Sequence, residues 1–427
     1  MVINTEKSDI KIIGDNILFV NKNLFAHYIL PLKNYSVASE SGIELNIDIL
    51  KSIFPTLVSN KPDLEFTIQR CTKVIKRRDI LNNLIDTIKI YTPDYNMPEE
   101  FTKNIRDNET EYCLLIIKLE QTDIVDIEGD TIWETAKNVV GQLANKVMSL
   151  GTLNLNIEKV MEIEDNIYSM IKSRCQRASA ELVFYNYASK LYPAYAISYD
   201  KLSYFKDTNY SDVLGSLTQT IEDKFGYFIM HNEGVDIFGL DPQDIYGCIL
   251  NLYEMPQIID KAYFPINVPN TQVSVKMLPK AKAAIAIKRK RGSIEAEWDE
   301  ANQAEAHNER LNALRTTYDI SNKAIEAIDN GELTCKFNVS ILVLGDSLKD
   351  LRDRTNAVIS SLKDRQILPS KSLKQCQDFV TTWVNLCPTR YPFMAPLEFP
   401  LSFQLNYGAI VGEFDAVVEV PSIGYTK

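Results

Sequence analysis

An alternating segment in the last third of the chain constrains the fold more than any other feature. From 335 to 343 every second residue is apolar. The apolar set is Cys335, Phe337, Val339, Ile341 and Val343, and the polar set between them is Lys336, Asn338 and Ser340. A period of two places the two sets on opposite faces of a strand, so the segment predicts a half-buried β-strand. Gly345-Asp346-Ser347 then predicts a turn and a helix N-cap, with a helix that ends near Arg365.

Other apolar runs predict further strands and helices. Gly14-Asp15-Asn16 separates two short apolar stretches and predicts a hairpin. Further strands are predicted at Leu24–Leu30, Leu64–Ile75, Tyr112–Leu119 and Tyr246–Tyr253, and an extended segment at Phe264–Val275. Helices are predicted at Ile43–Phe54, which ends before Pro55, at Thr131–Leu150, and over most of Ile157–Leu191.

A strand followed by a helix is thus expected at 112–150 and again at 333–365. Any α/β chain repeats this unit, so we do not take the recurrence alone as a sign of duplication.

Strong helix formers run from about Pro279 to Asn330, with Gly292 as the one interruption. Five apolar residues there form a heptad-like stripe: Leu311, Leu314, Tyr318, Ile325 and Ile328, with Ser321 in the gap. The pattern predicts a long helix or a helical hairpin near 279–330 that packs on a partner.

The length of 427 residues exceeds one ordinary core. We therefore predict a mixed α/β (α+β) fold with two subdomains, 1–205 and 206–427, each with a mixed sheet flanked by helices. No apolar run approaches the roughly 20 residues that span a bilayer, and the amino terminus lacks the pattern of an export signal.

Charge, cysteine and histidine content exclude several functional classes. The net charge of −11 argues against a dedicated nucleic-acid coat. The seven cysteines are scattered singly, which is typical of reduced core thiols. The three histidines, His27, His231 and His307, lie far apart without cysteine partners, so we expect no zinc site.

A search for catalytic motifs finds none. Only Gly234 and Gly239 have P-loop spacing, and the lysine that should follow is missing, so the chain has no Walker A sequence. No G-x-S-x-G occurs either. We predict no catalytic residues, no metal and no bound cofactor for this chain.

The strongest charge feature is the basic run Lys288-Arg289-Lys290-Arg291. The lysines just before the run are Lys276, Lys280 and Lys282, and the acidic residues just after it are Glu295, Glu297, Asp299 and Glu300. One interpretation is contact with phosphate or an anionic surface. The other, which we favour, is a charge-polarised helix whose ends pair with neighbours, because no aromatic residues interleave the basic run.

Several stretches, in order, carry a family resemblance. They are Ser173–Leu182, Tyr246–Pro256 with Phe264–Val268 and Pro279–Arg291, Leu333–Leu351, and a glycine-dotted run from Met394 through Gly408 and Gly412 to Thr426. Their pattern resembles the amino-terminal region of conjugation (type IV secretion) ATPases of the VirB/TraC/TrbE type, in the form found in Gram-positive conjugative elements. In that family Ser173–Leu182 would match an arginine-containing helix.

The resemblance implies a docking and assembly module that couples an ATP motor to inner-membrane channel subunits. A RecA-like motor with its Walker motifs, ATP and Mg²⁺ would follow Lys427, and the parent protein would be an ATPase that assembles as a homo-oligomer. The location implied is cytoplasmic, peripheral to the membrane through partners. Two alternatives stay open: a stand-alone nucleic-acid-binding accessory that uses the basic 276–291 segment, and an enzyme without a recognisable motif.

Overall fold

The computed structural model describes most of the regular structure of the chain. The described residues are 2–4, 10–30, 48, 50–75, 77–93, 108–119, 156–192, 214, 218–232, 243–254, 268, 270–303, 308–363 and 367–403. Within them, fourteen strands join one sheet, and their pairings are antiparallel.

The first half of the chain supplies one block of this sheet. Its strands are β2 (Lys11–Ile13), β3 (Ile17–Val20), β4 (Asn23–Leu30), β5 (Glu65–Ile75), β6 (Asn108–Leu119) and β7 (Gln176–Arg177). They lie in the order β2-β3-β4-β6-β5, and β7 pairs with β4. The hairpin predicted at Gly14 is present as β2 and β3.

The second half supplies a block with the same order. Its strands are β8 (Thr218–Lys224), β9 (Tyr227–Asn232), β10 (Gln243–Glu254), β11 (Thr271–Met277), β12 (Thr334–Gly345), β13 (Leu368–Lys371) and β14 (Phe393–Pro396). They lie as β8-β9-β10-β12-β11, and β13 pairs with β10. Each strand of the first block therefore has a counterpart in the second. β14, which pairs with β12, and β1 (Val2–Asn4), which pairs with β8, are additions to this scheme.

The two blocks meet where β5 pairs with β11. One row of paired residues crosses the sheet through this junction: Gln176, Ile29, Leu114, Gln69, Gln272, Ser340, Asn251 and Ser370. The strands in this row read β7-β4-β6-β5 and then β11-β12-β10-β13. Because the central pair is antiparallel, an approximate two-fold axis between Gln69 and Gln272 relates the halves. The two halves therefore share a strand topology, whereas the helix of the predicted 112–150 unit lies outside the described residues.

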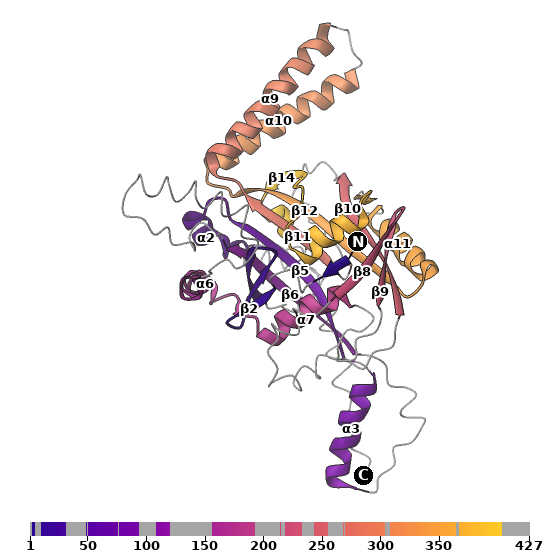
Figure 1. The fold of residues 1–427 in the computed structure, drawn as a ribbon. Coiled ribbons are helices and arrows are strands. Elements are labelled where there is room, and N and C mark those ends of the chain that lie inside the picture. Colours follow the sequence, from indigo (N-terminus) through magenta and orange to yellow (C-terminus); the bar gives the residue numbers. More distant parts are fainter. Residues whose placement is uncertain are drawn as a thin grey trace, which may run out of the picture.

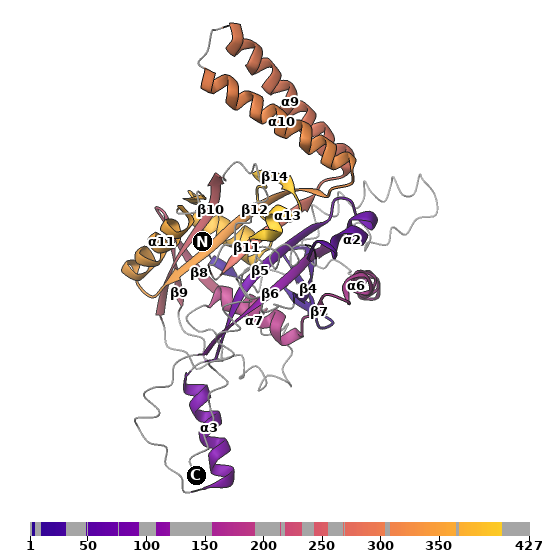
Figure 2. The same cartoon turned by 180° about the vertical axis from the view of Figure 1, so that it is seen from behind.

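Helices cover both faces of the sheet (Figures 1 and 2). Those on the first face are α2 (Phe54–Asn60), α6 (Ile157–Ile171), α11 (Leu348–Lys363) and α13 (Glu398–Ser402). Those on the second face are α7 (Ala180–Leu191), α12 (Gln375–Asp378) and the π-helical segment η5 (Phe379–Val384). α6 and α11 occupy equivalent places in the two halves, as do α7 and the pair α12–η5.

Three helices project from this body. α9 (Lys280–Gln303) and α10 (Asn308–Asp329) form a hairpin at one end, and α3 (Arg77–Tyr91) extends from the opposite end (Figures 1 and 2). Each projection follows the junction strand of its own half, since α3 comes after β5 and α9 comes after β11. Among the described helices, none has both the length and the hydrophobicity that crossing a bilayer requires.

The structure confirms the mixed α/β class and the helical hairpin near 279–330. Two details of that prediction differ. The sheets are not mixed, because the described pairings are antiparallel, and the strands of 1–205 and 206–427 form one continuous sheet across β5 and β11. The division into two subdomains therefore stays a prediction, while the boundary between the two strand blocks does fall between 192 and 218.

Two local predictions were wrong. β12 is buried on both faces: Ser340 is fully buried and its Oγ accepts a hydrogen bond from Trp383 Nε1 (3.1 Å). The segment 157–191 is mostly helix, as predicted, but the short strand β7 divides it, so the stretch 173–182 is not one helix. The described part of the helix predicted before Pro55 (48 and 50–51) is helical, and Pro55 itself lies in the first turn of the next helix, α2, where its missing N–H costs nothing. The helix predicted at Thr131–Leu150 lies outside the described residues.

Candidate functional site

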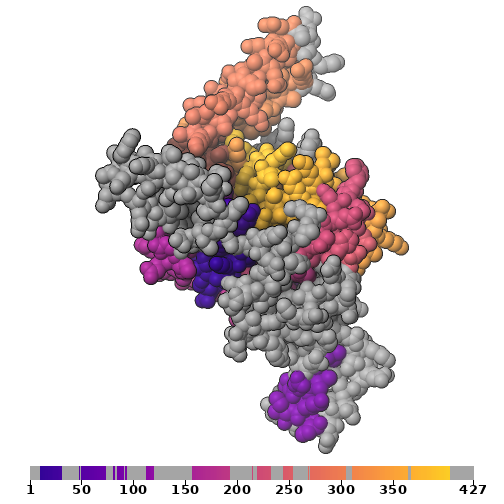
Figure 3. Space-filling view, viewed as in Figure 1, coloured from indigo at the N-terminus to yellow at the C-terminus, as the bar shows by residue number. Residues whose placement is uncertain are grey.

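The α9–α10 hairpin carries the basic run that the sequence singled out. Its base is a small apolar cluster in which Ala283, Ile287 and Ile328 are buried, and Met394 from β14 packs against them. The ends of the hairpin are tied together, because Lys280 Nζ donates to the carbonyl oxygen of Asp329 (3.0 Å). Figure 3 shows that the hairpin stands clear of the body.

The apolar stripe predicted on 311–328 faces the inside of this hairpin. Ser321 and Ile328 are buried, and the other stripe residues are half-buried. On α9, Ile294 and Ala301 are buried as well. The partner that the stripe packs on is therefore α9, and the hairpin turns mainly polar and charged side chains to solvent.

Arg291, the last residue of the basic run, belongs to the interior of the hairpin. Its Nη1 donates to Asn322 Oδ1 (3.3 Å), and its guanidinium carbon lies 6.0 Å from the centre of the Tyr318 ring. Its Nε lies 3.7 Å from Glu295 Oε1, one turn further along α9. The contacts with Asn322 and Tyr318 join α9 to α10, so Arg291 contributes to the packing of the hairpin.

Lys288, Arg289 and Lys290 differ from Arg291. All three are exposed, and none forms an ion pair with another described residue. Lys282 is also exposed and forms no ion pair with another described residue. The favoured interpretation, in which the basic run pairs with its neighbours, therefore fits Arg291 but not the other three residues of the run.

The remaining upstream lysine, Lys276, lies in the body rather than on the hairpin. It forms an ion pair with Glu65 across the β5–β11 junction, and Lys118 Nζ lies 3.1 Å from the second oxygen of the same carboxylate. Burial alone raises the pKa of Glu65, but hydrogen bonds and charges from Lys276 and Lys118 outweigh it and hold the pKa below its ordinary value.

The acidic residues that follow the basic run occupy the outer part of α9. Glu295, Glu297, Asp299 and Glu300 are exposed. α9 is therefore basic toward the body and acidic toward its outer end. A surface of this kind can attract one partner group of negative charge near the body and another of positive charge near the outer end of the helix.

The described histidines do not form a catalytic arrangement. His27 is fully buried; desolvation, together with the charge of Lys190, lowers its pKa to about 3. His231 is at the surface, where its ring nitrogens lie 3.1 Å from Asp244 Oδ1 and 3.4 Å from Glu222 Oε2. His307 and the Gly234–Gly239 turn lie outside the described residues.

All seven cysteines are described, and each is a free thiol; six are buried and Cys387 is half-buried. Burial raises the pKa of Cys71 and of Cys248 to about 11, so neither is a reactive thiolate at neutral pH. In the part of the chain that the structure describes, no group of three His, Cys, Asp or Glu side chains is arranged to hold a metal ion.

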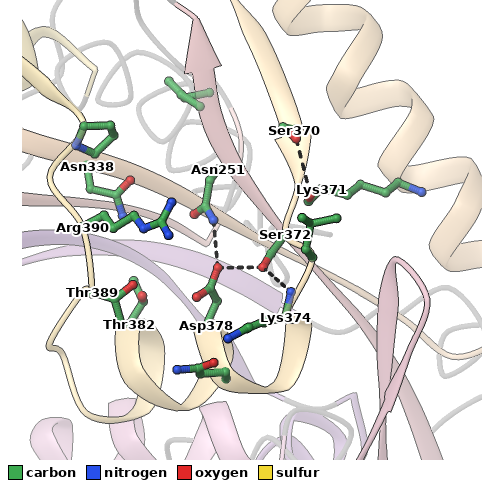
Figure 4. Close-up of a pocket in the computed structure, with 14 residues that line it drawn as sticks. Asn251, Asn338, Ser370, Lys371, Ser372, Lys374, Asp378, Thr382, Thr389 and Arg390 are labelled. Carbon is green, nitrogen blue, oxygen red and sulfur yellow. Dashed lines mark hydrogen bonds between the residues drawn. The ribbon is translucent and has the colours of Figure 1, made fainter.

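Sequence reasoning missed one hollow in the body. A pocket of about 620 Å³ lies over β10 and β12, beside β13 and α12 (Figure 4). Its lining residues come from three separate stretches of sequence between 251 and 392, so no local sequence pattern predicts the pocket. The one signal in the sequence is the polar set on β12, which includes Asn338.

No protein-family model matches this chain, and no curated protein sequence matches it. The resemblance to conjugation ATPases therefore rests on the sequence pattern alone and stays a prediction.

Proposed function

We propose that the chain is a protein-docking module of a conjugative type IV secretion ATPase and that it performs no catalysis itself. The observation that carries the proposal is the α9–α10 hairpin, which projects from the body (Figure 1). Its apolar stripe is closed inward, and its charged side chains are exposed. A charged arm that contributes little to the core of the body is suited to contact with another protein.

The dimensions of the arm support this use. α9 has 24 residues, which at 1.5 Å per residue is about 36 Å of helix. The arm thus reaches well beyond the sheet while its base stays fixed by the Lys280–Asp329 contact and by the Ile287 cluster. Strand β11 precedes α9 and strand β12 follows α10 in the chain. A partner that binds the arm would therefore transmit force to these two strands of the sheet.

In this proposal the other parts of the secretion ATPase are those that the family resemblance implies. The motor domain, with ATP and Mg²⁺, follows this chain, and the arm and body meet inner-membrane channel subunits at the cytoplasmic face of the membrane. Homo-oligomerisation belongs to the intact ATPase.

A capture experiment tests the proposal. The full chain is immobilised and offered purified inner-membrane channel subunits, beside a variant in which residues 280–329 are replaced by a short Gly/Ser linker. The backbone N–H of Leu278 donates to the carbonyl oxygen of Thr334 (3.0 Å) just outside the replaced segment, so the two ends that the linker joins lie close together. We expect the chain to capture a channel subunit and the deletion to lose it while the body still unfolds cooperatively. Equal capture by both proteins would contradict docking through the arm.

The alternative, a nucleic-acid-binding accessory, is favoured by one observation: Lys282, Lys288, Arg289 and Lys290 are exposed and unpaired among the described residues. A salt titration separates the two functions. DNA binding that weakens steeply with salt and is lost in the variant Lys288→Gln, Arg289→Gln, Lys290→Gln supports the alternative. The matched control neutralises the acidic end of the same helix, as Glu297→Gln, Asp299→Asn and Glu300→Gln, and should then strengthen DNA binding.

A further inference from the structure

The pocket over β10 and β12 has a polar floor. Asn338 and Thr382 line it and are only 8% and 4% exposed. Neither the Asn338 amide nor the Thr382 hydroxyl hydrogen-bonds to another described residue. Both residues line the hollow, so their unpaired side-chain groups are available to hydrogen-bond a molecule bound there.

The charged side chains of the pocket lining are mainly cationic. Arg390 and Lys374 line it together with Lys371, and none of the three forms an ion pair with a described residue. In Figure 4 the guanidinium end of Arg390 is directed toward Asn251, whereas the side chain of Lys371 extends away from the hollow.

One carboxylate, that of Asp378, also lines the pocket. Its Oδ2 accepts hydrogen bonds from Asn251 Nδ2 (3.1 Å) and Ser372 Oγ (2.7 Å). The Ser372 hydroxyl in turn accepts from the backbone N–H of Lys374 (3.0 Å). Asp378 is thus held in a network that fixes Asn251 and the loop carrying Lys374, and the cations of the lining outnumber it.

The first half of the molecule shows why the hollow exists. By the paired row across the sheet, Asn251 corresponds to Ile29, and Asn338 corresponds to Tyr112. Ile29 and Tyr112 pack against the second-face core, and the Tyr112 hydroxyl donates to Asn186 on α7 (3.4 Å). In the first half the aromatic ring of Tyr112 therefore fills this place. In the second half the equivalent place, beside Asn338, is open and polar.

We propose that this pocket binds a small ligand through an oxyanion group, a phosphate being the best match. The Arg390 guanidinium offers paired donors to two phosphate oxygens, Lys374 adds a charge, and Asn338 and Thr382 supply neutral donors from the floor. The volume is that of a site for a small organic molecule, and Leu373 and Pro392 give the rim apolar surface for its remainder. This site is independent of the docking function.

Calorimetric titration of the full chain in phosphate-free buffer at low ionic strength tests the proposal, with inorganic phosphate and AMP as probes. We expect both to bind. Arg390→Gln and Lys374→Gln should each weaken binding about tenfold, since each removes a charge-assisted hydrogen bond. Asn338→Asp should abolish binding, because it places a second carboxylate in the pocket.

Lys371→Gln is the matched control: it removes the same charge from a side chain that points away, and it should change the affinity less than twofold. Similar affinity for the two probes would identify free phosphate as the ligand, and tighter binding of AMP a phosphorylated molecule. The proposal is overturned if neither probe binds, or if Lys371→Gln weakens binding as much as Arg390→Gln. Arg390 and Lys374 are exposed, so these variants test the site even if Asn338→Asp does not fold.

Discussion

Gln69 and Gln272 lie opposite each other on β5 and β11, and the side-chain amide of Gln69 donates to the Gln272 carbonyl oxygen at 3.0 Å. Both are fully buried. Each also contacts the second-face helix of its own half: Asn186 Nδ2 donates to Gln69 Oε1, and Gln272 Nε2 donates to the backbone oxygen of Thr382. The approximate two-fold axis of the molecule thus passes through a closed polar network that links the two halves.

Replacing one of these glutamines should lower the free energy of unfolding by more than the loss of the Gln69–Gln272 hydrogen bond alone. Gln69→Leu leaves Asn186 without its acceptor and Gln272 without its donor, so we expect the free energy of unfolding to fall by about 1–3 kcal/mol. The double variant with Gln272→Leu should cost less than the sum of the single variants, because the shared bond is lost only once. Denaturant unfolding of the four proteins in a double-mutant cycle measures this. Strict additivity would show that the two halves are not coupled through this pair.

The ion pairs at the edge of the same junction should make stability depend on acidic pH. Since the pKa of Glu65 is held below its ordinary value in the folded protein, its contribution is complete above the ordinary glutamate pKa of about 4.3 and is lost as pH falls through the folded pKa. We therefore expect Glu65→Gln to destabilise the chain by about 1 kcal/mol at pH 7, and the difference from wild type to shrink toward pH 3.

Urea unfolding at several pH values checks the Glu65 prediction. Glu297→Gln, an exposed position on α9 without an ion pair among the described residues, is the control and should show no such pH dependence. A difference for Glu65→Gln that stays constant from pH 7 to pH 3 would contradict it.

Arg177 is predicted to matter for stability through Glu164. The Glu164 carboxylate is fully buried, and Arg177 contacts both of its oxygens, with Nε at 3.0 Å and Nη2 at 2.6 Å. Because removing one partner leaves a buried charge, Arg177→Leu should cost about 3 kcal/mol. Arg174→Leu, three residues earlier and exposed, should change stability by less than about 0.5 kcal/mol. Equal effects of the two substitutions on the midpoint of thermal unfolding would contradict this role.

Local patterns predicted the individual elements well. The turn at Gly14, the strands that became β4, β5, β6, β10 and β12, and the helical formers of 279–330 all appear where the periodicity placed them. These features depend on neighbours in sequence, so a single chain reveals them.

Features that depend on distant residues could not be read from the sequence. The polar residues of β12 looked solvent-exposed because alternation usually marks a half-buried strand, yet Asn338 and Ser340 are buried, and Trp383 Nε1 donates a hydrogen bond to Ser340. The joining of both halves through β5 and β11 is a pairing of strands about two hundred positions apart, which no window of sequence contains. The pocket follows from the same cause, because Asn251, Asn338 and Arg390 come together only in the folded sheet.

Hydrogen–deuterium exchange on the full chain, alone and with the assembled inner-membrane channel subunits, tests the docking account most directly. The account predicts slower exchange on α9 and α10 when the channel subunits are present, with the buried strands β5 and β11 unchanged. Unchanged exchange on both hairpin helices, under conditions where the subunits are bound, would contradict it.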